Sequence, residues 1–193
     1  MGDRIDEDVA ARCRAIADAW EALRHGSAVP TYASVLLRFD PLRLAPTYAE
    51  REAERIARAE VRVARNEGRS IEVPTVYEGP DLGDTAARSR LSIDELIALH
   101  SAREYRAFFL GFLPGFAYCG TLDPRIAAPR LERPRERVPA GSVAIADGQT
   151  AIYPFDSPGG WRLIGRTDVL PFDRSRDPVV LIRAGDRVRF VAR

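Results

Sequence analysis

One stretch of the sequence, residues 109–167, restricts the fold more than any other, because glycine and proline interrupt it at short intervals. Proline fixes φ and removes a backbone donor, so no long helix can run through the stretch. Glycine suits positive φ and the close approach of two backbones. The glycines are at positions 111, 115, 120, 141, 148, 159, 160 and 165, and the prolines at 114, 124, 129, 134, 139, 154 and 158. This composition predicts a rigid, turn-rich surface with polar groups and a positive rim, where we expect any functional site to lie.

All 29 basic residues are arginine and none is lysine, in a chain of 193 residues with a formal net charge of +1. The balanced charge gives no global reason to expect nucleic acid or membrane as a partner. Without lysine, the chain has no Schiff-base amine, no lysine general base and no phosphate-loop lysine. Any anion must therefore be bound by arginine guanidinium groups, backbone amides or helix N-termini.

The cysteine and histidine content argues against a metal enzyme. Cys13 and Cys119 are far apart in the sequence, and the only histidines are His25 and His100. This set is too small for a zinc site, so we predict no metal ligands. The sequence shows no signal peptide and no apolar run long enough to cross a membrane, which favours the reducing cytoplasm. Both cysteines are then expected to be buried thiols.

The first part of the chain alternates helical and strand-like patterns. Residues 5–24 have apolar residues at helical spacing and Asp6 as a cap, and residues 47–66 form a second helix with a glutamate–arginine surface. Residues 29–40 and 71–77 are strand-like, and Pro74 places the latter at a sheet edge. These four elements predict a small N-terminal α/β layer of the split βαβ, ferredoxin-like kind.

The second part of the chain is predicted to be mostly short strands. Two short helices, at residues 84–90 and 93–102, come first, and a capping box of Ser92 and Glu95 begins the second. Strand-type runs bounded by turns follow without intervening helices, which predicts a small barrel or sandwich. We therefore expect an α+β protein with an N-terminal α/β domain over residues 1–88 and a barrel domain over residues 89–193. The strand-type runs are residues 106–110, 141–146, 150–154, 161–167, 178–182 and 187–191.

An arginine-rich loop and a glycine pair are the clearest candidates for anion binding. The loop at residues 124–137 carries five arginines, which either form a clamp for phosphate or carboxylate or lie in solvent beside the loop's own acidic residues. The composition leaves both interpretations open. Residues 157–161 (SPGGW) form a tight turn whose amides can line an anion pocket, although glycine pairs are common. Neutral hydrogen-bonding residues suited to orienting a small polar ligand are Gln149, Thr150, Tyr153 and Ser157.

His100 and Cys119 are the candidates for proton transfer and nucleophilic attack. His100, near the end of the predicted helix at 93–102, can serve as a general base. A histidine whose hydrogen bonds are satisfied at a helix end is an equally good interpretation. Cys119 lies inside the turn-rich stretch, but no histidine close in sequence would activate it, so we assign it no catalytic role.

Several blocks of the sequence occur in a recognisable order: LGFLPGFAYCGTLDPR (110–125), PR (134–135), VPAGSVAIADGQTAIYP (138–154) and SPGGWRLIGRT (157–167), with PTYASVLLRFDP (30–41), VYEGPDL (76–82) and LSIDELIALH (91–100) upstream. Together they resemble the signature of the family of 5-oxoprolinase B subunits, which is also called allophanate hydrolase subunit 1 or the sporulation-kinase-inhibitor family. The resemblance covers nearly the whole chain. It implies an N-terminal α/β domain followed by a cyclophilin-like β-barrel, in agreement with the division expected from the patterns.

The resemblance also implies a function and partners. A member of this family would be the B subunit of an ATP-dependent 5-oxoprolinase complex, which converts 5-oxo-L-proline to L-glutamate. It implies ATP as co-substrate, with Mg²⁺ on the nucleotide. It further implies two partners, a homologous C subunit with a second cyclophilin-like barrel and an A subunit. Relatives occur as carboxyltransferase-like parts of urea and allophanate amidolyases and as an inhibitor of a sensor histidine kinase, so both stay as alternatives.

On this basis we expect a site that binds a nucleotide and a small carboxylate together, by positioning and electrostatics. Because the chain has no phosphate-loop motif and no assignable nucleophile, we expect it to be inactive alone. A peptidyl-prolyl isomerase is rejected, because the motif blocks do not contain the cyclophilin catalytic pattern. The expected site residues are Arg135, Gln149, Thr150, Ser157, Gly159, Gly160 and Arg166 for substrate or nucleotide, with His100 as proton carrier.

Overall fold

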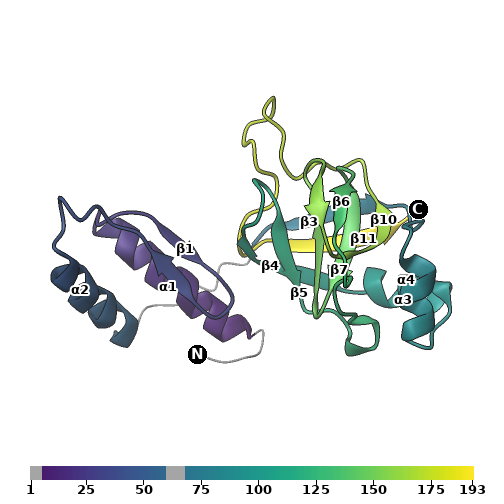
Figure 1. The fold of residues 1–193 in the computed structure, drawn as a ribbon, viewed down its shortest axis with the longest axis horizontal. Coiled ribbons are helices and arrows are strands. Elements are labelled where there is room, and N and C mark those ends of the chain that lie inside the picture. Colours follow the sequence, from purple (N-terminus) through teal and green to yellow (C-terminus); the bar gives the residue numbers. More distant parts are fainter. Residues whose placement is uncertain (1–5, 60–67) are drawn as a thin grey trace. The chain divides into compact units, whose positions relative to one another are not determined.

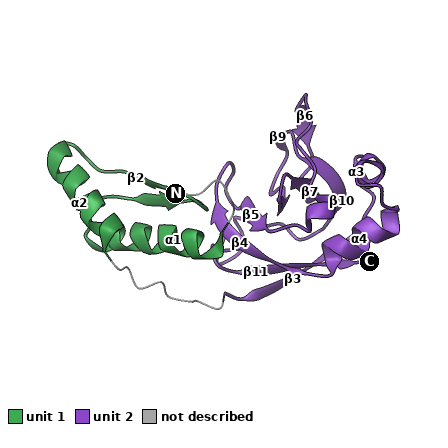
Figure 2. Cartoon of the chain, turned by 90° about the horizontal axis from the view of Figure 1, so that it is seen from below, with its two compact units in different colours: residues 1–66 green, residues 67–193 purple. Residues whose placement is uncertain are grey.

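The computed structural model describes residues 6–59 and 68–193, which form two compact units, residues 1–66 and residues 67–193 (Figures 1 and 2). The two units divide before β3 (Ser70–Thr75) and α3 (Leu82–Arg88). The domain boundary between residues 88 and 89 that the sequence predicted stays a prediction. Among the described residues, no helix is long and apolar enough to cross a membrane. The elements of the first unit are α1 (Glu7–Ala22), β1 (Ala28–Pro30), β2 (Val35–Leu37) and α2 (Pro46–Arg58).

The first unit packs two helices on a two-stranded antiparallel sheet. Asp6 caps α1, because its side chain accepts the amides of Asp8 and Val9 at 2.9 and 3.0 Å. Trp20 is buried in the core of the unit and donates its indole N–H to the carbonyl of Arg38 at 3.1 Å. The predicted strand at 29–40 is divided into β1 and β2. Residues 60–66 of the predicted second helix lie outside the described residues.

The second unit is built on one seven-stranded sheet in the order β10-β7-β8-β5-β4-β11-β3. Its sides meet where Val76 and Arg166 exchange backbone hydrogen bonds of 2.9 Å, so the sheet forms a nearly closed barrel. Gly79 allows this closure, because a Cβ there would lie 2.2 Å from the carbonyl oxygen of Leu163. The strands are β3 (Ser70–Thr75), β4 (Glu104–Leu110), β5 (Ala117–Gly120), β6 (Arg135–Val138), β7 (Ser142–Ala146), β8 (Gln149–Ile152), β9 (Ser157–Gly159), β10 (Arg162–Arg166) and β11 (Arg187–Ala192).

The expected α+β fold with a barrel is confirmed, but two strand predictions are wrong in detail. The strand predicted at 71–77 belongs to the barrel, because β3 pairs parallel with β11 over its whole length. The strand predicted at 178–182 is a loop with one isolated bridge, Phe172 to Val180. There the Arg176 guanidinium donates to four nearby backbone carbonyls at 3.1–3.3 Å, and these bonds take the place of strand pairing.

Alternating side chains bury both faces of the barrel sheet. In β7, Val143 and Ile145 pack inside the barrel, whereas Ala144 and Ala146 pack on the outer face against Tyr153 and its neighbours. The short hairpin of β6 and β9 forms a separate two-stranded sheet. Helices α3 (Leu82–Arg88) and α4 (Ile93–Ser101) lie next to each other on one side of the barrel (Figure 1), and the 3-10 turn Pro124–Ile126 contacts α4.

Candidate functional site

A pocket of about 300 Å³ lies beside the line where the barrel closes. Three arginines line it: Arg135 from β6, Arg137 from the same strand and Arg166 from the end of β10. Its other lining residues come from the turn after β3, the loop before β7 and strands β7 and β10, and they are Glu78, Gly79, Pro80, Pro139, Ala140, Ser142, Leu163 and Gly165. We call this the barrel pocket. It brings the predicted residues Arg135 and Arg166 together, although 31 positions separate them in the sequence.

Asp81 holds Arg135 in place. One carboxylate oxygen of Asp81 accepts from Arg135 Nη2 at 2.7 Å, and the other accepts the backbone amide of Leu163 at 2.7 Å. The side chain of Asp81 is buried and that of Arg135 is 29% exposed. A half-buried ion pair that also bonds to the barrel backbone fixes the direction of the guanidinium fork. Asp81 therefore positions one of the pocket's cations.

The other two arginines of the barrel pocket have exposed partners. Arg166 pairs with Glu78, and Arg137 donates from Nε to Asp156 at 2.8 Å. All four of these side chains are exposed to solvent. Such surface pairs contribute only about 0–1 kcal/mol. An anionic ligand can therefore replace the carboxylate partners of Arg137 and Arg166 at a small cost in free energy. Arg135 stays in position because Asp81 holds it.

Three of the predicted site residues have a buried polar atom without a hydrogen-bond partner among the described residues. These atoms are Nη1 of Arg135, Nε2 of Gln149 and Oγ of Ser157. A buried donor or acceptor left unpaired destabilises the folded state by about 1–3 kcal/mol. Native proteins rarely keep such groups unless water, an ion or a ligand satisfies them. These three atoms are therefore available to a ligand.

A second pocket, of about 260 Å³, lies on the outer face of the barrel and contains the predicted Gly159 and Gly160. Gly159 packs against Tyr153, because a Cβ there would lie 2.3 Å from the tyrosine oxygen. Arg130 lies over the Trp161 ring, 5.9 Å from its centre, which is a cation–π distance. We call this the aromatic pocket. It is lined by Phe112, Tyr118, Arg130, Pro134, Tyr153, Pro158, Gly159, Gly160 and Trp161.

His100 and Thr150 meet inside the barrel, away from both pockets. His100 is fully buried, and its Nε2 lies 2.9 Å from Thr150 Oγ1 while its Nδ1 lies 2.7 Å from the Tyr77 hydroxyl. Thr150 donates its own hydrogen to the carbonyl of Ala144, so it must accept from Nε2–H, and Nδ1 then accepts from Tyr77. Burial lowers the pKa of His100 to about 3, so the ring is neutral at physiological pH. The proton-carrier role of His100 stays a prediction.

Burial also makes Cys119 unreactive. The thiol lies in the barrel core, and burial raises its pKa to about 12. A thiolate nucleophile would therefore be absent at neutral pH. Among residues 6–59 and 68–193, no group of three or more histidine, cysteine, aspartate or glutamate side chains is placed to hold a metal ion.

The structure places Arg135 and Arg166 at the barrel pocket, Gly159 and Gly160 at the aromatic pocket, and His100 and Thr150 in the barrel interior. Gln149 at the start of β8 and Ser157 at the start of β9 line neither the barrel pocket nor the aromatic pocket. Sequence reasoning missed Asp81 and Glu78, the carboxylates that orient two of the arginines. Both lie in the block VYEGPDL, which entered the sequence analysis only as part of the family signature. An aspartate next to a proline and a glycine, far from any arginine in sequence, gives no local indication of its partner.

Comparison with known proteins identifies relatives over most of the chain. The family of carboxyltransferase domains, subdomain C and D, matches residues 1–182. A curated relative from Escherichia coli O157:H7, the B subunit of 5-oxoprolinase, is 51% identical over 128 residues, which cover 65% of this chain and 59% of that protein. The protein of the same name from Bacillus subtilis (strain 168) is 48% identical over 126 residues, covering 64% of this chain and 52% of that protein. The matched region spans between half and two thirds of these relatives.

Solved structures show the same fold. The crystal structure of a protein named TTHA0988 matches all of this chain and 38% of that chain, with 39% identity and a TM-score of 0.86. The urea carboxylase of Kluyveromyces lactis matches 98% of this chain and 20% of that chain, with a TM-score of 0.79. At 18% identity, the urea carboxylase supports the fold alone.

Proposed function

The chain belongs to the family of carboxyltransferase domains, subdomain C and D, and on this premise we propose that it acts as the B subunit of an ATP-dependent 5-oxoprolinase that converts 5-oxo-L-proline to L-glutamate. The names of its relatives support the proposal, because B subunits of 5-oxoprolinase are 51% and 48% identical to it. A cytoplasmic location is part of the proposal.

One observation in the molecule carries the proposal: three buried polar atoms without partners among the described residues belong to Arg135, Gln149 and Ser157. All three residues lie in the segments that resemble the family signature. Arg135 also lines the barrel pocket, whose arginine forks match the geometry of carboxylate and phosphate oxygens. A pocket of about 300 Å³ is at the small end of ligand sites, which run from about 300 to 1,000 Å³. It therefore suits a small carboxylic acid such as 5-oxoproline better than a whole nucleotide.

In the proposed reaction, the arginines act by position and charge. Arg166 releases Glu78 and binds the carboxylate of 5-oxoproline, while Arg135, held by Asp81, faces the oxygen on which negative charge develops as the lactam opens. ATP, with its Mg²⁺, supplies the activation of the amide. The Gln149 amide and the Ser157 hydroxyl are the neutral groups that would orient the substrate.

The proposed site is incomplete in this chain. The sequence contains no lysine, and Cys119 is buried with a raised pKa, so neither of these residue types supplies a nucleophile here. The barrel pocket also leaves little room for the base and sugar of a nucleotide. We therefore propose that a homologous C subunit and an A subunit supply the remaining groups. In addition to its predicted role as proton carrier, His100 would hold Thr150 and strand β8 in position through its hydrogen bond to the threonine hydroxyl.

The test is reconstitution. The chain is purified alone and together with candidate A and C subunits encoded beside it, and glutamate release from 5-oxoproline is measured with and without ATP. We expect ATP-dependent turnover only from the complex. The variant Arg135→Gln in the complex should lower kcat/KM by about 100-fold, corresponding to about 2.7 kcal/mol of lost transition-state stabilisation. ATP-dependent turnover by the isolated chain, or none by any complex, would refute the proposal.

The regulatory alternative rests on a separate observation, the aromatic pocket. Phe112 at its edge is 60% exposed, whereas Tyr153 and Trp161, which also line it, are buried. An exposed aromatic side chain such as Phe112 is typical of protein interfaces. Co-purification separates the two functions: a stable complex with a second barrel protein supports the enzyme, whereas a sensor histidine kinase as sole partner supports the inhibitor.

A further inference from the structure

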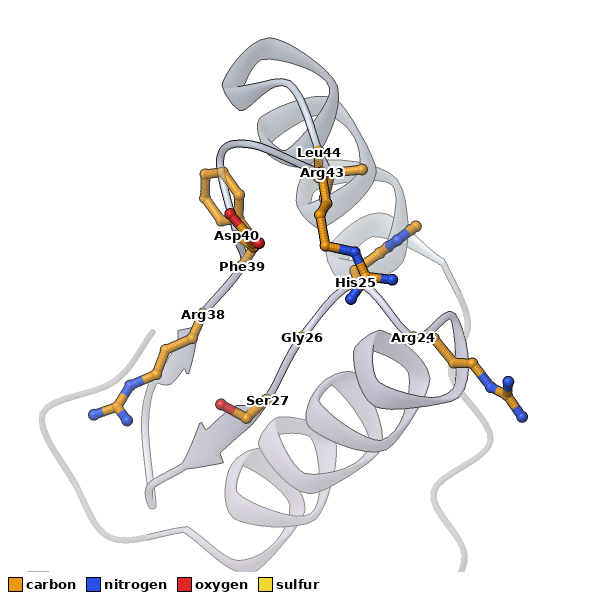
Figure 3. A pocket seen from close by; sticks show the side chains of 9 residues that line it. All are labelled: Arg24, His25, Gly26, Ser27, Arg38, Phe39, Asp40, Arg43 and Leu44. Carbon is orange, nitrogen blue, oxygen red and sulfur yellow. The ribbon is translucent and has the colours of Figure 1, made fainter.

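A pocket of about 370 Å³ in the first unit is not explained by the proposed function (Figure 3). It lies between the end of α1, the start of β1 and the loop that joins β2 to α2. Figure 3 shows Arg43 reaching across the pocket toward His25, whereas the guanidinium groups of Arg24 and Arg38 extend outward on opposite sides. We call it the helix pocket. Its lining residues are Arg24, His25, Gly26, Ser27, Arg38, Phe39, Asp40, Arg43 and Leu44.

The arginines of the helix pocket are not neutralised. Among the described residues, Arg24, Arg38 and Arg43 have no ion pair and no side-chain hydrogen bond, in contrast to the three arginines of the barrel pocket. Asp40 is the only carboxylate among the lining residues, and one of its oxygens already accepts the amide of Leu42 at 2.9 Å. Three arginines against one aspartate leave two uncompensated positive charges around the pocket.

The start of α2 adds a further positive potential. This helix begins at Pro46, directly after the pocket residue Leu44 and the cap residue Ala45. No side chain caps it, and its first turn contains no acidic residue. The N-terminus of a 13-residue helix carries the positive end of the helix dipole, which favours a bound anion.

His25 provides a third, independent indication. Its Nε2 is buried and has no hydrogen-bond partner among the described residues. The ring is held edge-on between Trp20 and Tyr48, at centre-to-centre distances of 5.1 and 6.0 Å. Glu52, whose charge interacts with His25, is itself paired with Arg55 at 2.5 Å. The unpartnered nitrogen therefore has no carboxylate of its own and is available to an oxygen of a bound anion.

We propose that the helix pocket binds a phosphate group. Arginine forks bind carboxylate and phosphate alike, but two uncompensated charges match a phosphate dianion better than a single carboxylate. The exposed ring of Phe39 at the rim offers a surface for an organic group attached to that phosphate. The site takes either inorganic phosphate or a phosphomonoester. It is separate from the barrel pocket and does not depend on the proposed enzymatic activity.

The test measures binding to the whole chain by isothermal titration calorimetry, with inorganic phosphate and with phenyl phosphate, at constant ionic strength and pH 8. We expect saturable binding with a Kd below about 1 mM. Tighter binding of phenyl phosphate would identify an organic phosphate as the ligand, and equal binding would identify phosphate alone. Binding of malonate as tight as that of phosphate would overturn the assignment to phosphate.

Two matched variants locate the site. Arg43→Gln removes an arginine that reaches across the pocket and should weaken phosphate binding by at least about tenfold, as expected for a charge-assisted contact. Arg51→Gln removes an exposed arginine of the same unit that does not line the pocket, and should change the Kd by less than about twofold. Both variants should keep the circular dichroism spectrum of the parent. Equal effects of the two substitutions, or no saturable binding by the parent chain, would overturn the proposal.

Discussion

The barrel pocket and the helix pocket each have three arginines, but their charges are arranged in opposite ways. In the barrel pocket every arginine has a carboxylate partner, and Arg135 is held by the buried Asp81. In the helix pocket no described carboxylate pairs with any of the three arginines. The ion pairs partly neutralise the arginines of the barrel pocket, and Asp81 also fixes Arg135, whereas the arginines of the helix pocket keep their full charge.

This difference indicates two kinds of anion recognition. A fixed, half-neutralised fork suits a site that must place a substrate accurately for a reaction. An uncompensated cluster of arginines beside a helix N-terminus suits binding that depends mainly on charge. Substitutions in the two units should change the free energy of unfolding by amounts that decrease from the buried pair of Asp81 and Arg135 to the unpaired arginines.

Removing the buried carboxylate of the barrel pocket should have the largest effect. Asp81→Ala leaves the Arg135 guanidinium without its partner and the Leu163 amide without its acceptor. We expect the free energy of unfolding to fall by about 3 kcal/mol, at the low end for a broken buried pair because Arg135 is 29% exposed. Urea denaturation gives the value. The matched control Glu78→Gln, which removes the exposed partner of Arg166, should lower it by less than about 1 kcal/mol. Equal losses in both variants would contradict the contrast between buried and exposed pairs.

His100 should make the stability of the barrel depend on pH. Its folded pKa of about 3 lies below the ordinary value of 6.5, so between these values the unfolded chain binds a proton that the folded chain does not. The free energy of unfolding should therefore fall as the pH drops from 6.5 toward 3, by up to about 1.4 kcal/mol per pH unit.

The variant His100→Phe isolates this effect. At pH 7 it should lower the free energy of unfolding by about 2 kcal/mol, because the Tyr77 hydroxyl loses its acceptor. Below pH 6.5 its stability should decrease less steeply than that of the parent chain. Urea titrations at several pH values measure both quantities. Parallel pH profiles for the two proteins would show that His100 is not the titrating group.

Two neighbouring glycines test how tightly the barrel side is packed. Gly159→Ala places a Cβ 2.3 Å from the Tyr153 oxygen, so the tyrosine must move. We expect a loss of about 1–2 kcal/mol and a change in near-ultraviolet circular dichroism. Gly160→Ala places its Cβ 3.6 Å from Pro134, an ordinary contact, and should change stability by less than about 0.5 kcal/mol. Indistinguishable variants would mean that Tyr153 is loosely packed.

The unpaired arginines should give the smallest effect on stability. Arg43→Gln breaks no ion pair, so the free energy of unfolding should change by less than about 0.5 kcal/mol. Repulsion between the arginines of the helix pocket would make this change an increase. Arg166→Gln, which breaks the pair with Glu78, should lower it by up to about 1 kcal/mol. Salt should stabilise the parent more than Arg43→Gln, because screening relieves repulsion only where it exists. A clear destabilisation by Arg43→Gln would reveal a partner for that arginine.

Much of the fold was predictable because its signals are local. Helix α1 is indicated by its Asp6 cap and its periodic apolar residues, and α4 by the capping box of Ser92 and Glu95. Each of these signals involves residues within one or two turns of the same helix. The strands β5, β6 and β9 were missed, because glycine and proline in residues 109–167 hide short strands that long-range pairing stabilises. β3 was recognised as a strand but assigned to the wrong unit, since its partner β11 lies more than 110 residues later.

The candidate site also has features that the sequence predicts and features that appear only in the folded chain. The residue types available for chemistry can be read from the sequence alone: arginine without lysine, neutral hydrogen-bonding groups in the turn-rich stretch, and a family signature around Arg135, Gln149 and Ser157. Which arginines are neutralised becomes clear only in the folded chain, because Asp81 and Arg135, 54 residues apart in sequence, meet through the closure of the barrel. The folded chain also shows that His100 is enclosed and neutral. Electrostatic effects depend on distance and burial in space, and these arise only when the strands pair.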